Sequence, residues 1–96
     1  MKNDWEKRIR QARSLIAKGR FQRFVTKDLS GYEKAPITDK VRIEGDVYTP
    51  FVDLQTAAVV YIAEARRKQD RVHTVLTFSA REVEGASRAY DWYDAD

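Results

Sequence analysis

The apolar segment at residues 53–69 constrains the fold more than any other part of the chain. Its apolar side chains recur at i, i+3, i+4, i+7, i+8 and i+11, which is the spacing of one face of an α-helix. These side chains are Leu54, Ala57, Ala58, Tyr61, Ile62 and Ala65. Asp53 precedes them and is suited to cap the helix. The pattern predicts a central helix over residues 53–69, covered on two sides because further apolar residues lie off the stripe: Val59, Val60 and Ala63.

Two further helices are predicted at the ends of the chain. Residues 4–18 carry an apolar stripe, with Asn3 as the expected N-cap and Gly19 as the C-terminal stop; the stripe consists of Trp5, Ile9, Ala12 and Ile16. After residue 78, Ser79 and Glu82 fit a capping box. A third helix is therefore expected to begin there, with an apolar stripe at Val83, Ala86, Tyr90 and Tyr93.

Aromatic and β-branched residues indicate two strands, over residues 20–27 and residues 71–78. The alternative for residues 20–27 is that the first helix continues through them. In the second strand, alternation places Val72, Leu76 and Phe78 on one face. Residues 28–39 contain turn and breaker residues and form the longest predicted loop.

A β-hairpin is predicted over residues 40–49, with a two-residue turn at Gly45 and Asp46. This turn would pair Ile43 with Tyr48 and put both on the inner face of the hairpin with Val41. Pro50 has no N–H to donate and is expected to end the second strand.

In chain order, these elements predict a small α+β domain. At 96 residues the chain has the length of a single domain, spanning residues 1–96. The expected order is helix, strand, β-hairpin, helix, strand, helix, with the helices packed on a small, mostly antiparallel sheet.

Composition places this domain in a reducing, aqueous compartment. The chain has no cysteine, which excludes disulfides and thiolate zinc sites. No apolar run approaches the roughly 18 residues of a membrane span, and the N-terminus lacks the apolar region of a signal peptide. We therefore expect a cytoplasmic protein without a membrane partner.

Charge is distributed unevenly along the chain. Residues 1–44 contain twelve Lys and Arg against six Asp and Glu, whereas residues 45–96 contain six against nine. The first half therefore has a net charge of +6 and the second half −3. A basic surface is predicted to bind phosphates or an acidic partner through Lys7, Arg10, Lys18, Arg20 and Arg23.

The last seven residues concentrate aromatic and acidic side chains. Trp and Tyr are frequent anchors in protein interfaces, so this tail is a predicted partner-binding site. Its residues are Tyr90, Asp91, Trp92, Tyr93 and Asp94. The alternative is that the tail docks on the basic first helix of its own domain.

Nothing in the sequence indicates catalysis. His73 is the single histidine and is predicted to lie in the middle of a strand, with no second His or any Cys to build a metal site around it. Glu82 and Glu84 are two residues apart on a predicted helix and point to different faces. The sequence thus predicts no catalytic residue, no metal and no cofactor.

These observations favour a non-catalytic regulatory or inhibitor-type protein that binds a larger protein complex. In size and in its lack of motifs the chain resembles small accessory proteins of bacteria and their phages, including those that block host defence complexes. The first alternative is a nucleic-acid-binding module that uses the basic N-terminal helix. The second is an oligomerising structural subunit, which would self-associate through Val59 and Val60 if these were exposed.

Overall fold

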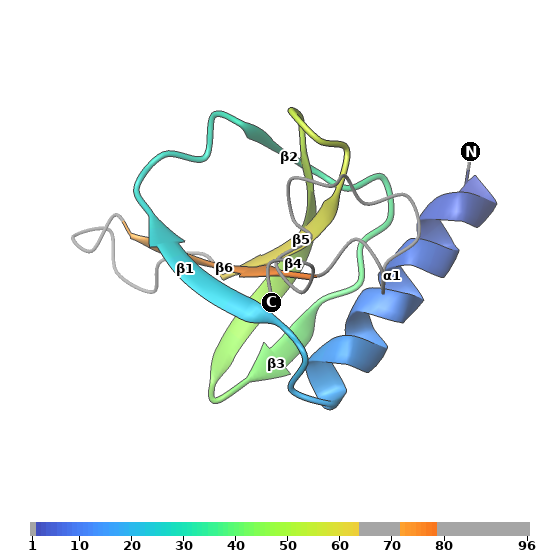
Figure 1. The fold of residues 1–96 in the computed structure, drawn as a ribbon, viewed down its shortest axis with the longest axis horizontal. Helices are drawn as coiled ribbons and strands as arrows, with labels where there is room; N and C mark the ends of the chain where they lie inside the picture. Colours follow the sequence, from blue (N-terminus) through green and yellow to red (C-terminus); the bar gives the residue numbers. More distant parts are fainter. Residues whose placement is uncertain (1, 64–71, 79–96) are drawn as a thin grey trace, which may run out of the picture.

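The computed structural model describes residues 2–63 and 72–78 of the chain. Within these two ranges, one helix is followed by six strands: α1 (Lys2–Ala17), β1 (Gln22–Thr26), β2 (Tyr32–Lys34), β3 (Val41–Ile43), β4 (Asp46–Asp53), β5 (Val59–Ala63) and β6 (His73–Thr77). The strands form an antiparallel sheet in the order β1-β6-β5-β4-β2, and β3 also pairs with β4. Figure 1 shows the curved sheet with α1 along one side.

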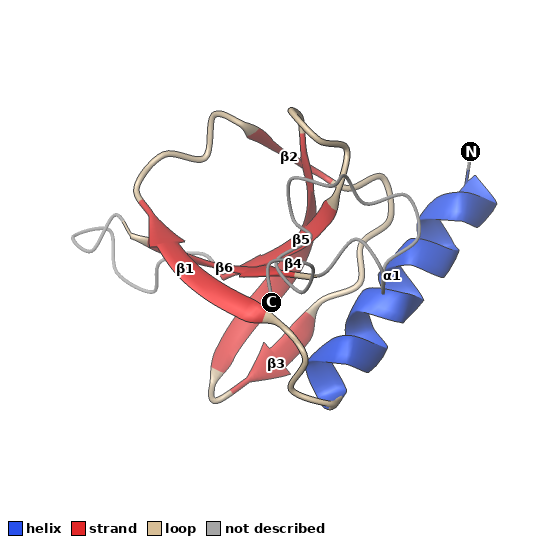
Figure 2. Ribbon diagram, in the orientation of Figure 1, coloured by secondary structure: helices blue, strands red, loops and turns tan. Residues whose placement is uncertain are grey.

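The predicted order with several helices is wrong, because the described part of the chain is mostly sheet (Figure 2). Where the central helix was predicted, β4 ends at Asp53 and the chain continues into β5. The predicted helix after residue 78 lies outside the described residues, as do residues 64–71. In the described ranges α1 is the only helix, and it is neither long nor apolar enough to cross a membrane.

Asp53 does cap a helical turn, but the turn is not continued. Its carboxylate accepts hydrogen bonds from the backbone N–H groups of Gln55 (2.8 Å) and Thr56 (3.3 Å). Its backbone carbonyl accepts one from the N–H of Ala57 (2.7 Å). Ala57 then adopts a left-handed conformation, with φ of 62°, which a continuing α-helix does not allow. The Asp53 N–H donates to the carbonyl of Ala58 (2.9 Å), so the chain reverses into β5.

All five residues of β5 are buried, because this central strand is covered on both faces. Val59, Tyr61 and Ala63 belong to the core cluster on the α1 side, whereas Val60 and Ile62 belong to a second cluster on the opposite face. A strand buried on both faces has a continuous apolar run, which periodicity alone does not distinguish from a buried helix. Val59 and Val60 therefore offer no exposed surface for self-association.

The α1-side core joins one face of α1 to one face of the sheet. Of the predicted stripe, Ile9 and Ala12 are buried in it, and Trp5 and Ile16 are partly buried against it; Leu15, next to the stripe, is buried as well. Among the sheet residues, the ring of Tyr61 meets that of Phe78 edge to face, with centroids 6.3 Å apart. The other sheet residues of this cluster are Tyr48, Val59, Ala63 and Leu76.

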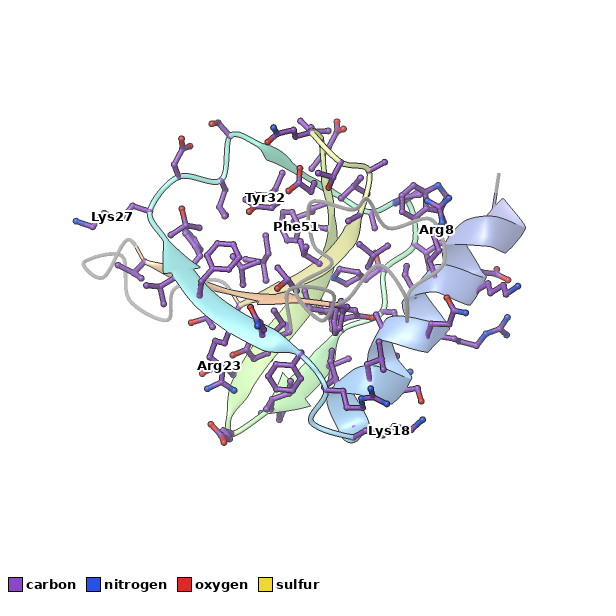
Figure 3. The ribbon with its side chains drawn as sticks, in the orientation of Figure 1. Arg8, Lys18, Arg23, Lys27, Tyr32 and Phe51 are labelled. Carbon is purple, nitrogen blue, oxygen red and sulfur yellow. The ribbon has the colours of Figure 1, made fainter. Side chains whose placement is uncertain are left out.

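The second cluster lies on the opposite face of the sheet. Val60, Ile62 and Val75 are completely buried there beside Phe51. Leu29 and Tyr32 pack against this cluster from the segment between β1 and β2 and from β2 itself. Figure 3 shows Tyr32 and Phe51 close together at this side of the sheet. The sheet thus separates two apolar layers.

The end of α1 follows the prediction. Gly19 has φ of 72°, its N–H donates to the carbonyl of Ile16, and the N–H of Arg20 donates to the carbonyl of Leu15. This pair of bonds is a Schellman motif, which ends a helix and reverses the chain. The helix begins at Lys2, so Asn3 lies inside it rather than at the N-cap.

The predicted strands at residues 20–27 and 71–78 are confirmed as β1 and β6, with Leu76 and Phe78 on the α1 side as expected. The predicted loop at residues 28–39 contains the short strand β2. β2 has only three residues and lies between turn residues, so the alternation of apolar and polar side chains is too short to predict a strand.

The hairpin is confirmed, but its predicted turn is wrong. Ile43 pairs with Asp46 and Val41 with Tyr48, so the turn residues are Glu44 and Gly45. Both have positive φ, 52° and 87°, as a type I′ turn requires. The register differs from the predicted one by two residues. A shift of two preserves the faces, so Val41, Ile43 and Tyr48 share the inner face as predicted.

Pro50 does not end the second strand of the hairpin, as the sequence suggested, but lies inside β4. Its carbonyl accepts a hydrogen bond from the N–H of Ala35 (3.0 Å), on the side of β4 that faces β2 and β3. In an antiparallel strand the N–H and C=O of one residue point to the same side. The missing N–H of Pro50 therefore falls between the segments of β4 that pair with β2 and β3, where the ladder is interrupted.

The strand at residues 59–63 leads to a stability prediction. Ile62→Ala removes a completely buried side chain and should lower the free energy of unfolding by about 2–5 kcal/mol. Leu54→Ala should change it by less than about 0.5 kcal/mol, because the Leu54 side chain is 56% exposed in the turn after β4. Urea unfolding followed by circular dichroism measures both. If both variants lose the same free energy of unfolding, the strand is contradicted, since a helix over residues 53–69 would bury both positions on one stripe.

Candidate functional site

The main candidate site is a groove of about 630 Å³ between the end of α1, the start of β1 and the β3–β4 hairpin. We call it the basic groove. Apolar residues of the groove are Ile16, Ala17, Phe21, Val41 and Ile43. All of these except Ala17 also pack against the α1-side core, so the floor of the groove is the outer margin of that core.

Charged residues surround this apolar floor. They are Arg13, Lys18, Arg23, Arg42 and Glu44. Glu44 is the single acid among them, so the lining has a formal charge of +3. Asp39 lies beside the groove and compensates one cation, and the C-terminal end of α1 contributes about half a negative charge. A positive excess remains, so the groove should attract anionic groups.

Two local turns assemble the basic groove. The Schellman motif at Gly19 reverses the chain, so that Phe21 returns towards the core margin. The type I′ turn at Glu44 and Gly45 folds β3 back on β4. Figure 1 shows the end of α1, the start of β1 and β3 gathered at one end of the molecule. Segments far apart in the sequence therefore meet in this groove.

Arg13 is held in place by an ion pair. Its Nη1 lies 3.2 Å from Oδ1 of Asp39, which ties α1 to the segment between β2 and β3. The two side chains are 52% and 28% exposed, so water screens the pair and its contribution to stability is below about 1 kcal/mol. Its main consequence is geometric, because it orients one cation of the groove.

Arg23 of β1 contacts Phe21, which directly precedes this strand, and the Arg23 charge acts on Tyr48 of the β3–β4 hairpin. Its guanidinium lies 5.7 Å from the ring centroid of Phe21, within the range of a cation–π contact. Burial raises the pKa of the Tyr48 phenol, the Arg23 charge opposes this increase, and Asp46 and Glu44 add to it. Charges from β1 and from the β3–β4 hairpin thus act on the same phenol.

Only some of the predicted basic residues come together. Lys18 and Arg23 line the groove, and Figure 3 shows both at the same end of the molecule. Arg20 lies between them in the chain but is not part of the lining. Lys7 and Arg10 are exposed on α1, about 15 and 10 Å along the helix axis from its last residue. The five residues therefore do not form one site.

Sequence reasoning missed two cations of the groove, Arg13 and Arg42. Arg13 flanks the apolar stripe of α1, where a long basic side chain usually only covers the edge of the stripe. Arg42 belongs to a strand more than twenty residues away, and no local pattern connects it with α1. The predicted tail residues, Tyr90 to Asp94, lie outside the described residues.

A second hollow, of about 580 Å³, has a different character. It is lined by polar residues and one exposed leucine: Thr26, Asp28, Ser30, Gly31, Tyr32, Asp53, Leu54 and Gln55. Its two carboxylates are already used by local turns. Asp28 accepts a hydrogen bond from the Ser30 N–H (2.9 Å), which lowers the pKa of this carboxyl, and Asp53 caps its own turn. We assign this hollow a structural role.

No metal site emerges from residues 2–63 and 72–78. Within these ranges no group of three His, Cys, Asp or Glu side chains is placed to hold a metal ion. His73 lies in β6, opposite Thr26 of β1, and its Nδ1 is buried without a hydrogen-bond partner among the described residues. A search of protein-family models, curated proteins and solved structures finds no match to this chain.

Beneath the Arg13–Asp39 pair lies the completely buried phenol of Tyr61. Its Oη makes no hydrogen bond of standard geometry among the described residues. Burial raises the pKa of Tyr61 strongly; the nearby Asp39 carboxylate raises it further, and Arg13 opposes this effect. The phenol therefore remains neutral well above the ordinary pKa of about 10.

Tyr61→Phe should stabilise the protein by about 1 kcal/mol near neutral pH, because it removes a buried hydroxyl that has no hydrogen-bond partner of standard geometry among the described residues. Because the raised pKa keeps the phenol neutral in the folded state while the phenol of the unfolded chain ionises above about pH 10, the free energy of unfolding of the wild type falls as the pH rises above 10. The advantage of the variant should therefore widen in alkaline solution. Urea unfolding at about pH 8 and about pH 11 measures the difference.

Tyr32→Phe is the matched control for this measurement. Burial, and to a lesser degree Asp53, raises the pKa of Tyr32 as well, but this ring is partly exposed, so the alkaline effect should be smaller. An advantage of Tyr61→Phe that stays constant between the two pH values would show that the phenol ionises freely in the folded state.

Proposed function

We propose that this protein is a non-catalytic binding protein that holds an acidic, partly apolar segment of another protein in the basic groove. This agrees with the small regulatory or inhibitor-type protein expected from the sequence, with a larger assembly such as a host defence complex as its target. The observation that carries the proposal is the combination of four cations with an apolar floor in one recess.

Two properties of the groove support a protein partner. Arg and aromatic side chains dominate the energetics of protein interfaces, and here Arg23 lies over Phe21. The apolar floor adds area whose burial favours association with an apolar side chain. An acidic partner would also be steered towards the groove by its positive charge.

Nucleic-acid binding is the second candidate, favoured by Lys7 and Arg10 on the exposed side of α1. Phosphate backbones need an extended row of cations rather than an apolar recess. The two candidates therefore depend on different residues, because the groove cations serve the first and the α1 cations the second.

A pull-down from bacterial lysate tests the proposal. The wild type should capture at least one protein, and nuclease treatment of the lysate should not prevent this capture. Lys18→Glu with Arg42→Glu should reduce its capture about tenfold or more, because two attractive charges become repulsive. Quantitative mass spectrometry of the captured proteins measures the change.

The matched control is Arg10→Glu with Lys34→Glu, which makes the same charge change at two exposed positions outside the groove. This control should capture the partner as the wild type does. If both variants lose capture of the partner equally, the effect is due to the net charge of the protein and not to the basic groove. Capture that disappears with nuclease, and with Arg10→Glu, would favour nucleic acid and overturn the proposal.

The aromatic–acidic tail remains a predicted second contact. If Trp92 is an interface anchor, Trp92→Ala should weaken binding of the captured protein by about 2 kcal/mol or more, while the circular dichroism spectrum stays that of the wild type. Titration calorimetry measures the affinity. An unchanged affinity would remove the tail from the interface and leave the basic groove as the contact.

A further inference from the structure

β1 is an edge strand with an exposed outer side. Among the described strands it pairs only with β6, and its residues are largely exposed. Phe24 is 40% exposed and Val25 is 64% exposed, which is unusual for large apolar side chains in a strand. Such an edge presents backbone N–H and C=O groups that can pair with another extended chain.

Few protective devices are present on this edge. Natural proteins block edge strands with prolines, bulges, several charges or a very short strand. β1 has five residues, no proline, a continuous register with β6 and one charged residue, Arg23. Its backbone is therefore well suited to accept a further strand.

The basic groove continues from this edge. Phe21 and Arg23 line the groove and belong to the start of β1 or directly precede it. Across the groove lies β3, which among the described strands pairs only with β4. The basic groove therefore lies between β1 and β3, each of which has an edge that no other described strand pairs with. An extended segment on β1 would have one end in this groove.

We propose that β1 accepts an extended acidic segment of the partner protein as an additional strand, with one end of that segment in the basic groove. This inference rests on the proposed function and specifies how the partner binds. Strand addition supplies affinity through main-chain hydrogen bonds and specificity through alternate side chains. The partner segment should then match the two faces of β1.

Register defines these two faces. Arg23 is opposite Leu76, on the α1 side of the sheet, whereas Phe24 is opposite Val75, on the other side. Lys27 follows β1 directly and extends away from the body of the protein (Figure 3). A segment that alternates acidic and apolar residues would place its acids beside Arg23 and its apolar side chains beside Phe24.

Charge argues against a second copy of this chain as the occupant. Antiparallel pairing of two β1 strands around Phe24 would put the two Arg23 side chains on one face, about 7–8 Å apart on the diagonal. Like charges at this distance repel, and β1 contains no acid to compensate them. An acidic segment of a different protein removes this repulsion.

Amide NMR of the full-length protein tests the inference with a defined probe, an end-blocked peptide of alternating valine and glutamate. We expect a Kd below about 1 mM and shift changes that include the amides of residues 22–26. A peptide of alternating valine and lysine should bind about tenfold more weakly. The glutamate peptide with every residue N-methylated keeps its charges but has no backbone N–H to donate from either edge, so its binding should fall by at least as much.

The outcomes separate strand pairing from groove binding. If the N-methylated peptide binds as well as its parent, and Lys18→Glu with Arg42→Glu abolishes both, the acidic segment lies in the groove alone, and strand pairing is overturned while the proposed function stands. If the glutamate peptide does not bind below about 1 mM, or binds no better than the lysine peptide, an acidic strand on β1 is excluded.

Two further measurements exclude other occupants. Sedimentation equilibrium should show no dimer through β1, and a dimer broken by Phe24→Ser would identify a second copy as the occupant. A variant with Asp91, Asp94 and Asp96 changed to asparagine should bind the glutamate peptide as the wild type does. Tighter binding by this variant would identify the tail of the chain itself as the competing occupant and overturn the inference.

Discussion

Burial of β5 on both faces is the constraint on which the rest of the structure depends. Five consecutive apolar residues at the centre of the sheet require a cover on each side. On one side α1 provides it, through Ile9, Ala12 and Leu15. On the other side lies the cluster around Phe51 and Val75, with Leu29 and Tyr32 packed against it. Each completely buried side chain contributes roughly 1.5–3 kcal/mol of transfer free energy, so this strand organises the packing of its neighbours.

The basic groove follows from the way in which this core ends. The α1-side core reaches the surface at Phe21, Val41 and Ile43, which are only partly buried. Turns at Gly19 and at Glu44 and Gly45 bring the surrounding cations to this margin. The same apolar residues therefore stabilise the fold and supply the floor of the candidate site. Cations held beside an apolar margin are a recurring arrangement in protein interfaces, where Arg combines charge with a large planar contact area.

Several elements could be predicted because their signals are local. The stripe of α1 and its stop at Gly19 need only neighbouring residues, and the strands around Phe24 and Leu76 need only their β-branched and aromatic content. The hairpin turn was misplaced by one residue because Glu44 adopts positive φ, which is uncommon for a residue other than glycine. Its inner face was nevertheless correct, since a register shift of two leaves the faces unchanged.

Other features had no local signal. Asp53 caps a turn as a helix N-cap would, yet Ala57 reverses the chain into β5. Pro50 stays within β4 because the missing donor falls between β2 and β3, which no neighbouring residue reveals. Of the groove, Lys18 and Arg23 could be predicted as basic residues near the end of α1, whereas Arg42 could not be connected with them.

The sequence by itself determined the first helix and its end, the edge strand β1 and its neighbour β6, the inner face of the hairpin and the positive charge of the first half of the chain. Only the tertiary structure decided that residues 59–63 form a strand, that strand β4 continues through Pro50, and that β1 and β3 border one groove. The physical reason is the distance along the chain over which each interaction acts. Caps, stripes and turn residues act over a few positions, whereas the choice between a buried strand and a buried helix depends on which distant segments cover its two faces.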